Sequence, residues 1–377
     1  MEKKNVPFWL NLALPLFALL FTFLLMEALV RIAVPRGKWQ SWDMGADMNT
    51  DAELGWKYKP NLNLKTWGLE GEVRFRTNED GVLPHTEKPN TEKRHVLLVG
   101  DSTVIGRHVP EGKRLHDWLQ KELSQDVSSP VSVVNLAVEG YSTDQSLVRL
   151  ERMIERYQPE VVIYGFCLND LSQNRVSVAW GVPKLRYAWQ GDELIKVIPT
   201  QSAKNLEFGK TAFRKWLNQS ALFQMVKGPL KKMLGSAQEP AGVGVTDHFN
   251  LFYFDAEQTK DPIPWKLFDG LLSKMSTLVR SRQAKFLLYG HPDALAVWKP
   301  YREEMATAKQ LASFSPLRAE KKLIEFLGDE GIFCPMVERM AAHPEKGPYH
   351  LIPYDAHANS AGYRAIAESL AACLSSS

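Results

Sequence analysis

The sequence predicts an α/β domain built on a parallel sheet, preceded by one helix that spans a membrane. Three short apolar runs, residues 96–99, 160–165 and 285–290, have the length and continuity of strands that are buried on both faces. Helical patterns separate these runs, and strands joined through helices pair in parallel with right-handed crossovers. The third observation is an almost wholly apolar run near the N-terminus, residues 8–26.

The composition is that of an ordinary globular protein. The chain has 377 residues, 45% hydrophobic and 24% charged, with a formal net charge of +3. It has no long basic run, so we expect no nucleic-acid partner. Its three cysteines are too few for a disulfide framework, and their odd number leaves at least one thiol free. Without a CxxC or His-rich cluster, we expect no metal and no cofactor.

The apolar run at residues 8–26 is long enough, at roughly 28 Å as a helix, to cross the hydrocarbon core of a bilayer. A cleaved signal peptide and a buried core helix are the alternatives. The run is longer than a usual signal core and no small-residue cleavage site precedes Pro35, so we favour an uncleaved anchor over residues 1–35. Charge does not settle the orientation, because Arg31, Arg36 and Lys38 after the run balance Lys3 and Lys4 before it. A two-residue basic head with a large body after it favours a single-pass protein whose N-terminus is inside and whose main domain is periplasmic or extracellular.

Residues 36–90 are aromatic and rich in Pro and Gly, which predicts a linker and a small β-rich lead-in. Alternation at 73–77 indicates a strand, and 78–81 a turn. This segment has four tryptophans, Trp39, Trp42, Trp56 and Trp67. They either form a platform for a glycan or cover the flank of the main domain, and we favour the flank.

Residues 91–377 form the predicted main domain, which alternates strands and helices. An insertion at about 172–250 interrupts it and is expected to cover the active face. The further elements predicted are strands at 131–136 and 331–334, helices after 112 and at 143–157, 264–281, 316–327 and 360–374, and, within the insertion, a hairpin at 184–198, a helix at 217–234 and a loop at 236–245.

A serine follows the first buried strand of the main domain. Gly100 ends the strand, and Asp101 and Ser102 come next, before a helical segment. A small polar residue there lies at the carboxyl edge of the sheet, where open α/β folds place their ligands. Ser102 is therefore either a nucleophile or a cap of the following segment, and Asp101 is expected to bond backbone groups at the turn.

Two other strand ends and a C-terminal loop carry groups that suit a nucleophilic serine. A serine hydroxyl needs a base such as imidazole, and the base needs an orienting carboxylate, which His357 and Asp355 can supply. The backbone N–H groups of Ser102 and Gly140 and the amide of Asn169 can hold a developing oxyanion. Each has a structural alternative: Asn169 as a cap, Gly140 as a tight turn, and Cys167 nearby as packing. His291 and His350 are rival bases.

These residues stand in blocks that resemble those of the SGNH/GDSL hydrolase superfamily. Gly100-Asp101-Ser102-Thr103 resembles the first block, with Thr103 where GDSL has leucine. Residues 135–140 resemble the second block and 165–170 the third. Asp355-Ala-His357, with Asn359 and Gly362 after it, resembles the last. The lead-in Leu54-Gly-Trp56 and the anchor resemble those of membrane-anchored bacterial members.

The resemblance implies a three-layer α/β/α sandwich of the flavodoxin-like type. It implies Ser102 as nucleophile, His357 as base, Asp355 as orienter, and Ser102, Gly140 and Asn169 as the oxyanion hole. The family's last block is usually Asp-x-x-His, whereas one residue separates Asp355 from His357 here. This spacing leaves two arrangements open, a triad with Asp355 or a dyad in which a backbone carbonyl orients His357.

The activity implied by the resemblance is hydrolysis of O-acyl esters, including O-acetyl groups on envelope glycans. Acyl transfer to or from a glycan is one alternative, because a sugar can intercept the same acyl-enzyme in place of water. A non-catalytic glycan-binding protein on the same fold is another.

Overall fold

The computed structural model describes residues 8–39, 47–84, 93–124, 130–200, 217, 219–233, 265–305, 314–345, 347–352 and 355–376. The predicted loop at 236–245 and much of the predicted insertion lie outside these residues.

The core of the protein is a five-stranded sheet with the order β13-β12-β7-β5-β6, in which every neighbouring pair is parallel. When the five strands are numbered along the chain and the sheet is read from β6, their order is 2-1-3-4-5, which is that of flavodoxin-like folds. The inner strands are almost completely buried, as their apolar runs predict. The strands are β5 (Arg94–Val99), β6 (Val131–Asn135), β7 (Val161–Phe166), β12 (Lys285–Gly290) and β13 (Ile332–Phe333).

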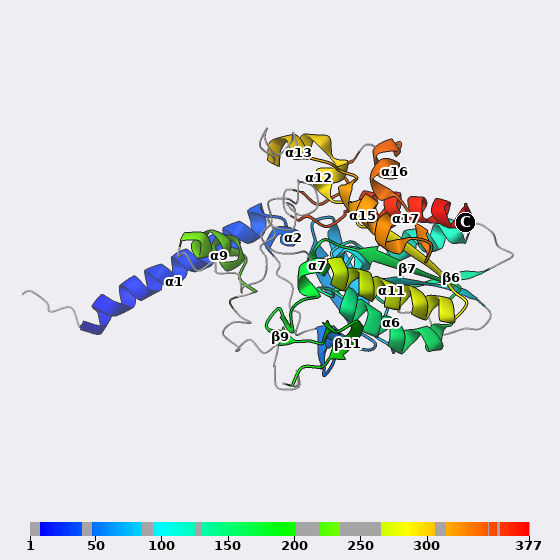
Figure 1. The fold of residues 1–377 in the computed structure, drawn as a ribbon. Helices are drawn as coiled ribbons and strands as arrows, with labels where there is room; N and C mark the ends of the chain where they lie inside the picture. The colour runs from blue at the N-terminus through cyan, green and yellow to red at the C-terminus, as the bar shows by residue number, and fades with distance from the viewer. Residues whose placement is uncertain are drawn as a thin grey trace, which may run out of the picture.

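Helices cover both faces of this sheet (Figure 1), which confirms the predicted three-layer α/β/α sandwich. On one face α5 (Leu115–Leu123) packs against α17 (Ser360–Ser375). On the other face α11 (Trp265–Ser281) contacts both α6 (Thr143–Tyr157) and α15 (Arg318–Leu327). The sequence predicts α6 and β12 to the residue, because each has a sharp start and stop signal.

The lead-in is β-rich, as predicted, and it packs on the sandwich. It forms two hairpins, and after them Leu83 exchanges two backbone hydrogen bonds with Asn135 on the edge of β6 (3.2 and 2.7 Å). Trp56 is completely buried, so it covers the flank of the domain. The division of the chain into three parts stays a prediction. The hairpins are β1 (Met48–Asp51) with β2 (Gly55–Tyr58), and β3 (Asn63–Gly68) with β4 (Gly71–Arg76).

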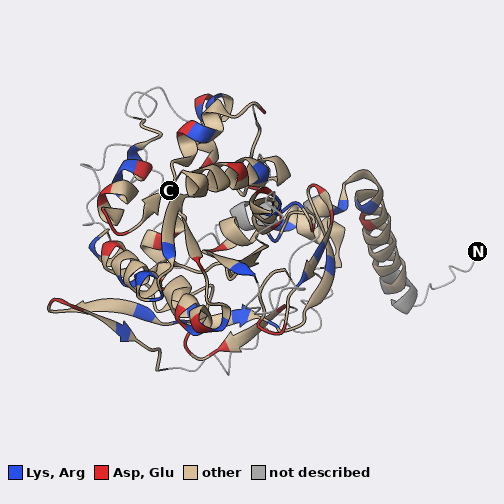
Figure 2. Ribbon diagram, turned by 90° about the vertical axis from the view of Figure 1, so that its right-hand side faces the viewer, with Lys and Arg blue, Asp and Glu red and all other residues tan. Residues whose placement is uncertain are grey.

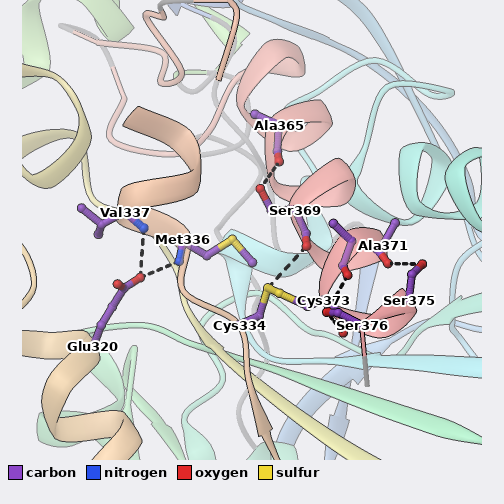
Figure 3. Close-up of a disulfide and its surroundings, with 11 residues drawn as sticks. Glu320, Cys334, Met336, Val337, Ala365, Ser369, Ala371, Cys373, Ser375 and Ser376 are labelled. Atoms are coloured by element: carbon purple, nitrogen blue, oxygen red, sulfur yellow. Dashed lines mark hydrogen bonds between the residues drawn. A yellow bond between two sulfur atoms is a disulfide. The ribbon is translucent and has the colours of Figure 1, made fainter. Parts of the chain in front are cut away.

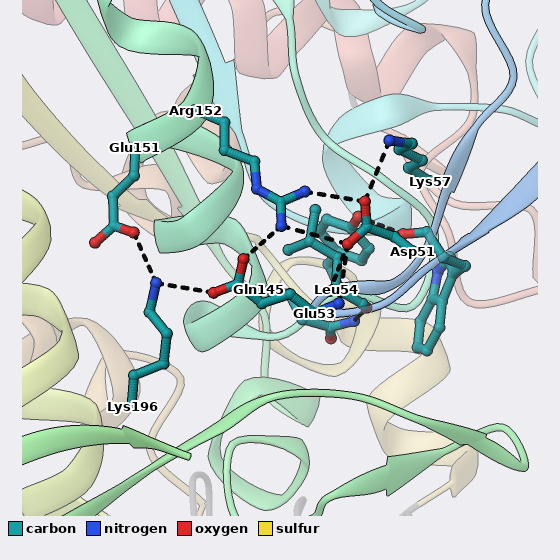
Figure 4. A network of polar contacts seen from close by, with 10 residues as sticks. Asp51, Glu53, Leu54, Lys57, Gln145, Glu151, Arg152 and Lys196 are labelled. Carbon is teal, nitrogen blue, oxygen red and sulfur yellow. Dashed lines mark hydrogen bonds and ion pairs between the residues drawn. The ribbon is translucent and has the colours of Figure 1, made fainter. Parts of the chain in front are cut away.

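A charged network joins the first lead-in hairpin to the main domain (Figure 4). Arg152 of α6 donates to both Asp51 and Glu53 of the lead-in (3.0 and 2.5 Å). Lys196 binds Glu53 and Glu151 (3.0 and 3.2 Å), which adds the predicted insertion to the same network. Three segments far apart in the sequence are thus held together at one side of α6.

The described part of the predicted insertion contains two hairpins and a helix. The predicted hairpin is β10 (Arg186–Gln190) with β11 (Glu193–Val197), and the predicted helix is α9 (Ala221–Met233). A second hairpin, β8 (Val178–Ala179) with β9 (Val182–Pro183), was not predicted because its strands are too short to show a pattern. Short helices were missed for the same reason: α2 (Arg36–Trp39), α7 (Asn169–Gln173), α12 (Ala294–Val297), α13 (Lys299–Met305) and α16 (Met336–Ala342).

The N-terminal helix α1 (Phe8–Ala33) extends away from the sandwich (Figure 1). Residues 13–33 are long and apolar enough to cross a membrane, none of that stretch is buried, and a signal sequence has the same properties. Figure 2 shows its charged residues only near the body, where Glu27 and Arg31 lie. Glu27 accepts hydrogen bonds from Ala221 N and Leu222 N (2.8 and 2.9 Å), so α9 begins against α1.

A disulfide joins Cys334, just after β13, to Cys373 in α17 (Figure 3). It links the last strand of the sheet to the helix that follows the C-terminal loop. Cys167 is free, in agreement with the prediction that an odd number of cysteines leaves at least one thiol unpaired.

Candidate active site

Ser102 lies at the carboxyl end of β5, as the first residue of the short helix α4 (Ser102–Ile105). Gly100 has φ +154°, and a Cβ there would come within 2.5 Å of Val104 Cγ2, so the turn requires glycine. Asp101 is the cap of α4, because its Oδ1 accepts from the backbone N and Oγ1 of Thr103 (2.9 and 2.6 Å). The predicted structural role of Asp101 is confirmed, and the alternative in which Ser102 is the cap is wrong.

The structure brings Ser102 together with His357 and Asp355, which the predicted site required. The Nε2 atom of His357 lies 2.8 Å from Ser102 Oγ, although 255 residues separate the two along the chain. Its Nδ1 atom lies 2.5 Å from Asp355 Oδ1. With Nδ1–H donating to the carboxylate, Nε2 is left to accept the hydroxyl proton of Ser102.

The short Asp-x-His spacing is accommodated because the chain turns back on itself. Asp355 Oδ1 also accepts from the backbone N of His357 (2.9 Å), which closes an Asx-type turn. Leu351 N donates to His357 O (3.0 Å) and fixes the loop on the other side. Of the two arrangements that the sequence left open, the geometry is that of Asp355 beside the imidazole.

The electrostatics of the pair favour transfer of a proton to His357, because the charge of Asp355 stabilises the imidazolium that forms. Burial disfavours the imidazolium, but the hydrogen bond and the charge of Asp355 outweigh it and raise the pKa of His357. Burial works against the Asp355 carboxylate as well. The hydrogen bonds and charge of His357 nevertheless lower the pKa of Asp355 to about 2, so it stays ionised.

The other two predicted residues lie at the ends of the strands beside β5. Asn169 begins α7 after β7, and its Oδ1 is buried with no hydrogen-bond partner in the part of the chain that the structure describes. Gly140 follows β6 with φ +73°. Val138 N donates to Gly100 O (3.3 Å), which draws the loop after β6 toward the Ser102 turn. The three loops therefore share one edge of the sheet, as the parallel order requires.

The two rival bases, His350 and His291, make no hydrogen bond to Ser102 among the described residues. His350 Nε2 donates to Pro292 O (2.8 Å). Both ring nitrogens of His291 are buried without a partner among the described residues. Burial lowers the pKa of His350 to about 4 and that of His291 well below its ordinary value. It is His357, and not either of these, that reaches Ser102 Oγ.

His108 is a residue of the site that sequence reasoning missed. Its ring centroid lies 4.8 Å from that of His357, and its Nε2 donates to Ala358 O (3.0 Å). Burial, together with the charge of His357, lowers the pKa of His108 to about 4. A neutral His108 holds the C-terminal loop without adding a second positive charge. No motif in the sequence marks it, because its importance depends on a loop 250 residues away.

Arg107 was missed as well, and it joins the lead-in to the loop that carries Gly140. Its buried guanidinium binds Asp47 of the lead-in, and it binds Glu139 at 3.1 Å. Its charge also lies over the ring of Tyr58, at 5.8 Å from the centroid.

Within the described residues, no group of three or more His, Cys, Asp or Glu side chains is arranged to hold a metal ion.

No family model matches the chain, and no curated protein matches its sequence. Among solved structures it is similar to the α/β hydrolase LAE5 from the metagenome of Lake Arreo, Spain, at 10% identity over 77% of this chain and 98% of that one, with a TM-score of 0.42. It is also similar to a lipase/acylhydrolase from Enterococcus faecalis, at 13% identity over 74% and 94%, with a TM-score of 0.38. It is similar as well to an esterase, EstA from Pseudoalteromonas sp., at 11% identity over 75% of this chain and 98% of that one, with a TM-score of 0.36. Because these TM-scores are below 0.5, we rest the function on the chain's own geometry.

Proposed function

We propose that the chain is a serine esterase that cleaves O-acyl esters, with Ser102 as nucleophile, His357 as general base and Asp355 as its orienting carboxylate. The observation that carries the proposal is the continuous contact from Asp355 Oδ1 through the imidazole to Ser102 Oγ, at 2.5 and 2.8 Å. A hydroxyl next to an oriented base is the arrangement that acyl transfer needs. A glycan-binding protein without catalysis would have no need of it.

In the first half of the reaction, Ser102 Oγ attacks the ester carbonyl carbon while its proton passes to His357 Nε2. The carbonyl electron pair moves onto oxygen. The backbone N–H groups of Ser102 and Gly140 and the amide of Asn169 stabilise that oxyanion. The intermediate then expels the alcohol, which takes the proton from Nε2, and the acyl group stays on Ser102.

In the second half, water attacks the acyl carbon and gives its proton to Nε2. The carboxylic acid leaves, and the proton returns to Ser102 Oγ. A sugar hydroxyl that attacks in place of water produces a new ester by the same steps, so hydrolysis and acyl transfer differ only in the attacking group. The products of the reaction distinguish them.

The substrate we propose is an O-acyl ester, O-acetyl groups included, on a glycan of the cell envelope. We place the catalytic domain outside the cytoplasm of a single-pass membrane protein. The apolar helix α1 supports a membrane span. Lys3 and Lys4 before it are balanced by Arg31, Arg36 and Lys38 after it, so the orientation rests on the short head before the helix and the large body after it. The Cys334–Cys373 disulfide supports it independently, since disulfides persist in oxidising compartments.

The test uses the full chain in detergent with 4-nitrophenyl acetate, with and without cellotetraose, and mass spectrometry of the products. We expect Ser102→Ala to lower kcat by about 10⁴-fold or more without changing the melting temperature. Ser281→Ala, on the opposite end of the domain in α11, is the matched control and should be unchanged. Free acetate supports hydrolysis, and acetylated cellotetraose supports transfer. Turnover of Ser102→Ala within tenfold of the wild type contradicts the assignment.

A further inference from the structure

An exposed tryptophan stands at the tip of the β8–β9 hairpin. Trp180 and Gly181 form its turn, with φ of +55° and +77°. A turn with two positive φ angles favours Asn-Gly, and a bulky residue in this region costs about 1–2 kcal/mol. Trp180 is also 66% exposed, so little of its apolar surface is buried. A costly backbone conformation under a side chain that is mostly exposed indicates a role outside folding.

Trp180 lies against Gly140, the proposed oxyanion residue. A Cβ built on Gly140 would lie 2.6 Å from Trp180 Nε1 and 3.3 Å from its Cδ1. The N–H edge of the indole therefore borders the loop after β6, beside the Ser102 turn. This N–H has no hydrogen-bond partner among the residues that the structure describes.

The hairpin that carries Trp180 is held from below by buried contacts. Lys184, directly after β9, binds Asp144 of α6 at 2.6 Å, and both side chains are completely buried. Leu185 N donates to Glu53 O of the lead-in (2.8 Å). Glu53 belongs to the network of Figure 4, which ties the lead-in to Arg152 of α6. Because these contacts fix the hairpin, the exposed side chain of Trp180 is preorganised to bind a ligand.

Among the described residues, the two other exposed tryptophans differ from Trp180 because a cation already lies over each ring. The charge of Arg36 lies 5.5 Å from the centroid of a Trp67 ring, and that of Lys266 lies 4.9 Å from that of Trp189. Each of these two tryptophans is 36% exposed. Trp56, which the sequence offered as part of a glycan platform, is fully buried under the Gly140 loop and donates its Nε1–H to Glu139 O (2.8 Å).

We propose that Trp180 forms a sugar-binding subsite beside the oxyanion loop, for the pyranose that carries the ester. The C–H groups of a pyranose face are partly positive and suit the negative face of an indole, while the free N–H suits a sugar hydroxyl. This inference rests on the proposed esterase function and assigns its substrate class, an esterified carbohydrate. It gives Trp180 a binding role, and the reacting groups stay those already named.

The experiment compares Trp180→Ala, Trp180→Phe and Trp189→Ala in the full chain, with mono-O-acetylated cellotetraose and 4-nitrophenyl acetate as substrates. For Trp180→Ala we expect KM for the sugar ester to rise at least tenfold while kcat changes less than threefold. The ratio of kcat/KM for the sugar ester to that for 4-nitrophenyl acetate should then fall about tenfold. Trp180→Phe, which keeps a ring face, should lie between, and Trp189→Ala should match the wild type.

Three outcomes would overturn the subsite. The first is an equal loss on both esters, which makes Trp180 a support of the Gly140 loop. The second is a loss of kcat/KM in Trp180→Ala that is larger for 4-nitrophenyl hexanoate than for 4-nitrophenyl acetate, which makes Trp180 a contact of the acyl chain. The third is no change in any constant.

Calorimetry with unesterified cellotetraose separates this proposal from the esterase assignment. If wild-type protein turns over no ester beyond Ser102→Ala, the proposed function has failed. The subsite is still supported if Ser102→Ala binds cellotetraose and the added Trp180→Ala change weakens that binding at least tenfold. It is contradicted if binding is absent or is the same in both proteins.

Discussion

Asp355 Oδ1 lies 2.5 Å from His357 Nδ1, although a single residue separates the two along the chain. The same oxygen accepts the backbone N–H of His357 at 2.9 Å. One carboxylate oxygen therefore both forms the turn and orients the imidazole. This local turn lets the Asp-x-His spacing give the contact for which the family that the sequence resembles usually has Asp-x-x-His.

We expect Asp355→Asn to lower kcat for 4-nitrophenyl acetate by about 10⁴-fold, because an amide in this position favours the wrong tautomer of His357. His357→Ala should lose a similar factor. Asp329→Asn, at an exposed position after α15, is the control and should be unchanged. A loss below tenfold for Asp355→Asn, beside a large loss for His357→Ala, would instead favour a dyad.

The pH profile of kcat/KM should rise with pH through a midpoint above 6.5, the usual pKa of imidazole. His357 acts as a base only when neutral, and Asp355 raises its pKa, so activity is present above that pKa and lost as pH falls through it. Residual activity of Asp355→Asn should titrate at lower pH, because the stabilising charge is gone. Measured profiles with equal midpoints would show that Asp355 does not set the pKa of His357.

Asn169→Ala should lower kcat by about 10²–10³-fold, or about 3 kcal/mol of barrier, with little change in KM. An oxyanion donor acts on the charged intermediate and much less on the bound ester. Asn49→Ala, at an exposed position of β1, is the control. Steady-state kinetics decide the matter: a rise in KM alone would make Asn169 a substrate contact.

Lys184→Met should destabilise the protein by about 3–5 kcal/mol, because it leaves Asp144 buried without its cation. The comparison is Lys299→Met, which removes an exposed ion pair with Glu303 and should cost below about 1 kcal/mol. Urea denaturation of the full chain in detergent measures both. Similar midpoints for the two variants would mean that the buried pair does not hold the β8–β9 hairpin in place.

A reporter fused after Ser377 tests the topology. Alkaline phosphatase, which folds only outside the cytoplasm, should be active there, and a fluorescent cytoplasmic reporter should be dark. The physical basis is the apolar helix α1 with a short head before it and the large body after it. An inactive phosphatase together with a bright fluorescent reporter would place the domain inside the cell.

The sequence alone determined the layered α/β architecture and the ends of several elements. Buried parallel strands appear as continuous apolar runs, and α6 carries a capping box at Ser142 and Gln145, so these features are local. The same holds for the candidate residues at strand ends, Ser102, Gly140 and Asn169. The order of parallel strands places their carboxyl ends at one edge of the sheet, whatever the loops do.

The tertiary structure alone decided how Asp355 meets His357 across so short a spacing and which residues surround the pair. The sequence favours His357 over His291 and His350 through its Asp-x-His block, but only the fold brings His357 Nε2 within 2.8 Å of the Ser102 hydroxyl. Trp180 shows no periodic pattern, because its hairpin strands have two residues each. Its place beside Gly140 depends on Lys184 and Asp144, whose pairing is a long-range contact, and such contacts leave no local signal in a single sequence.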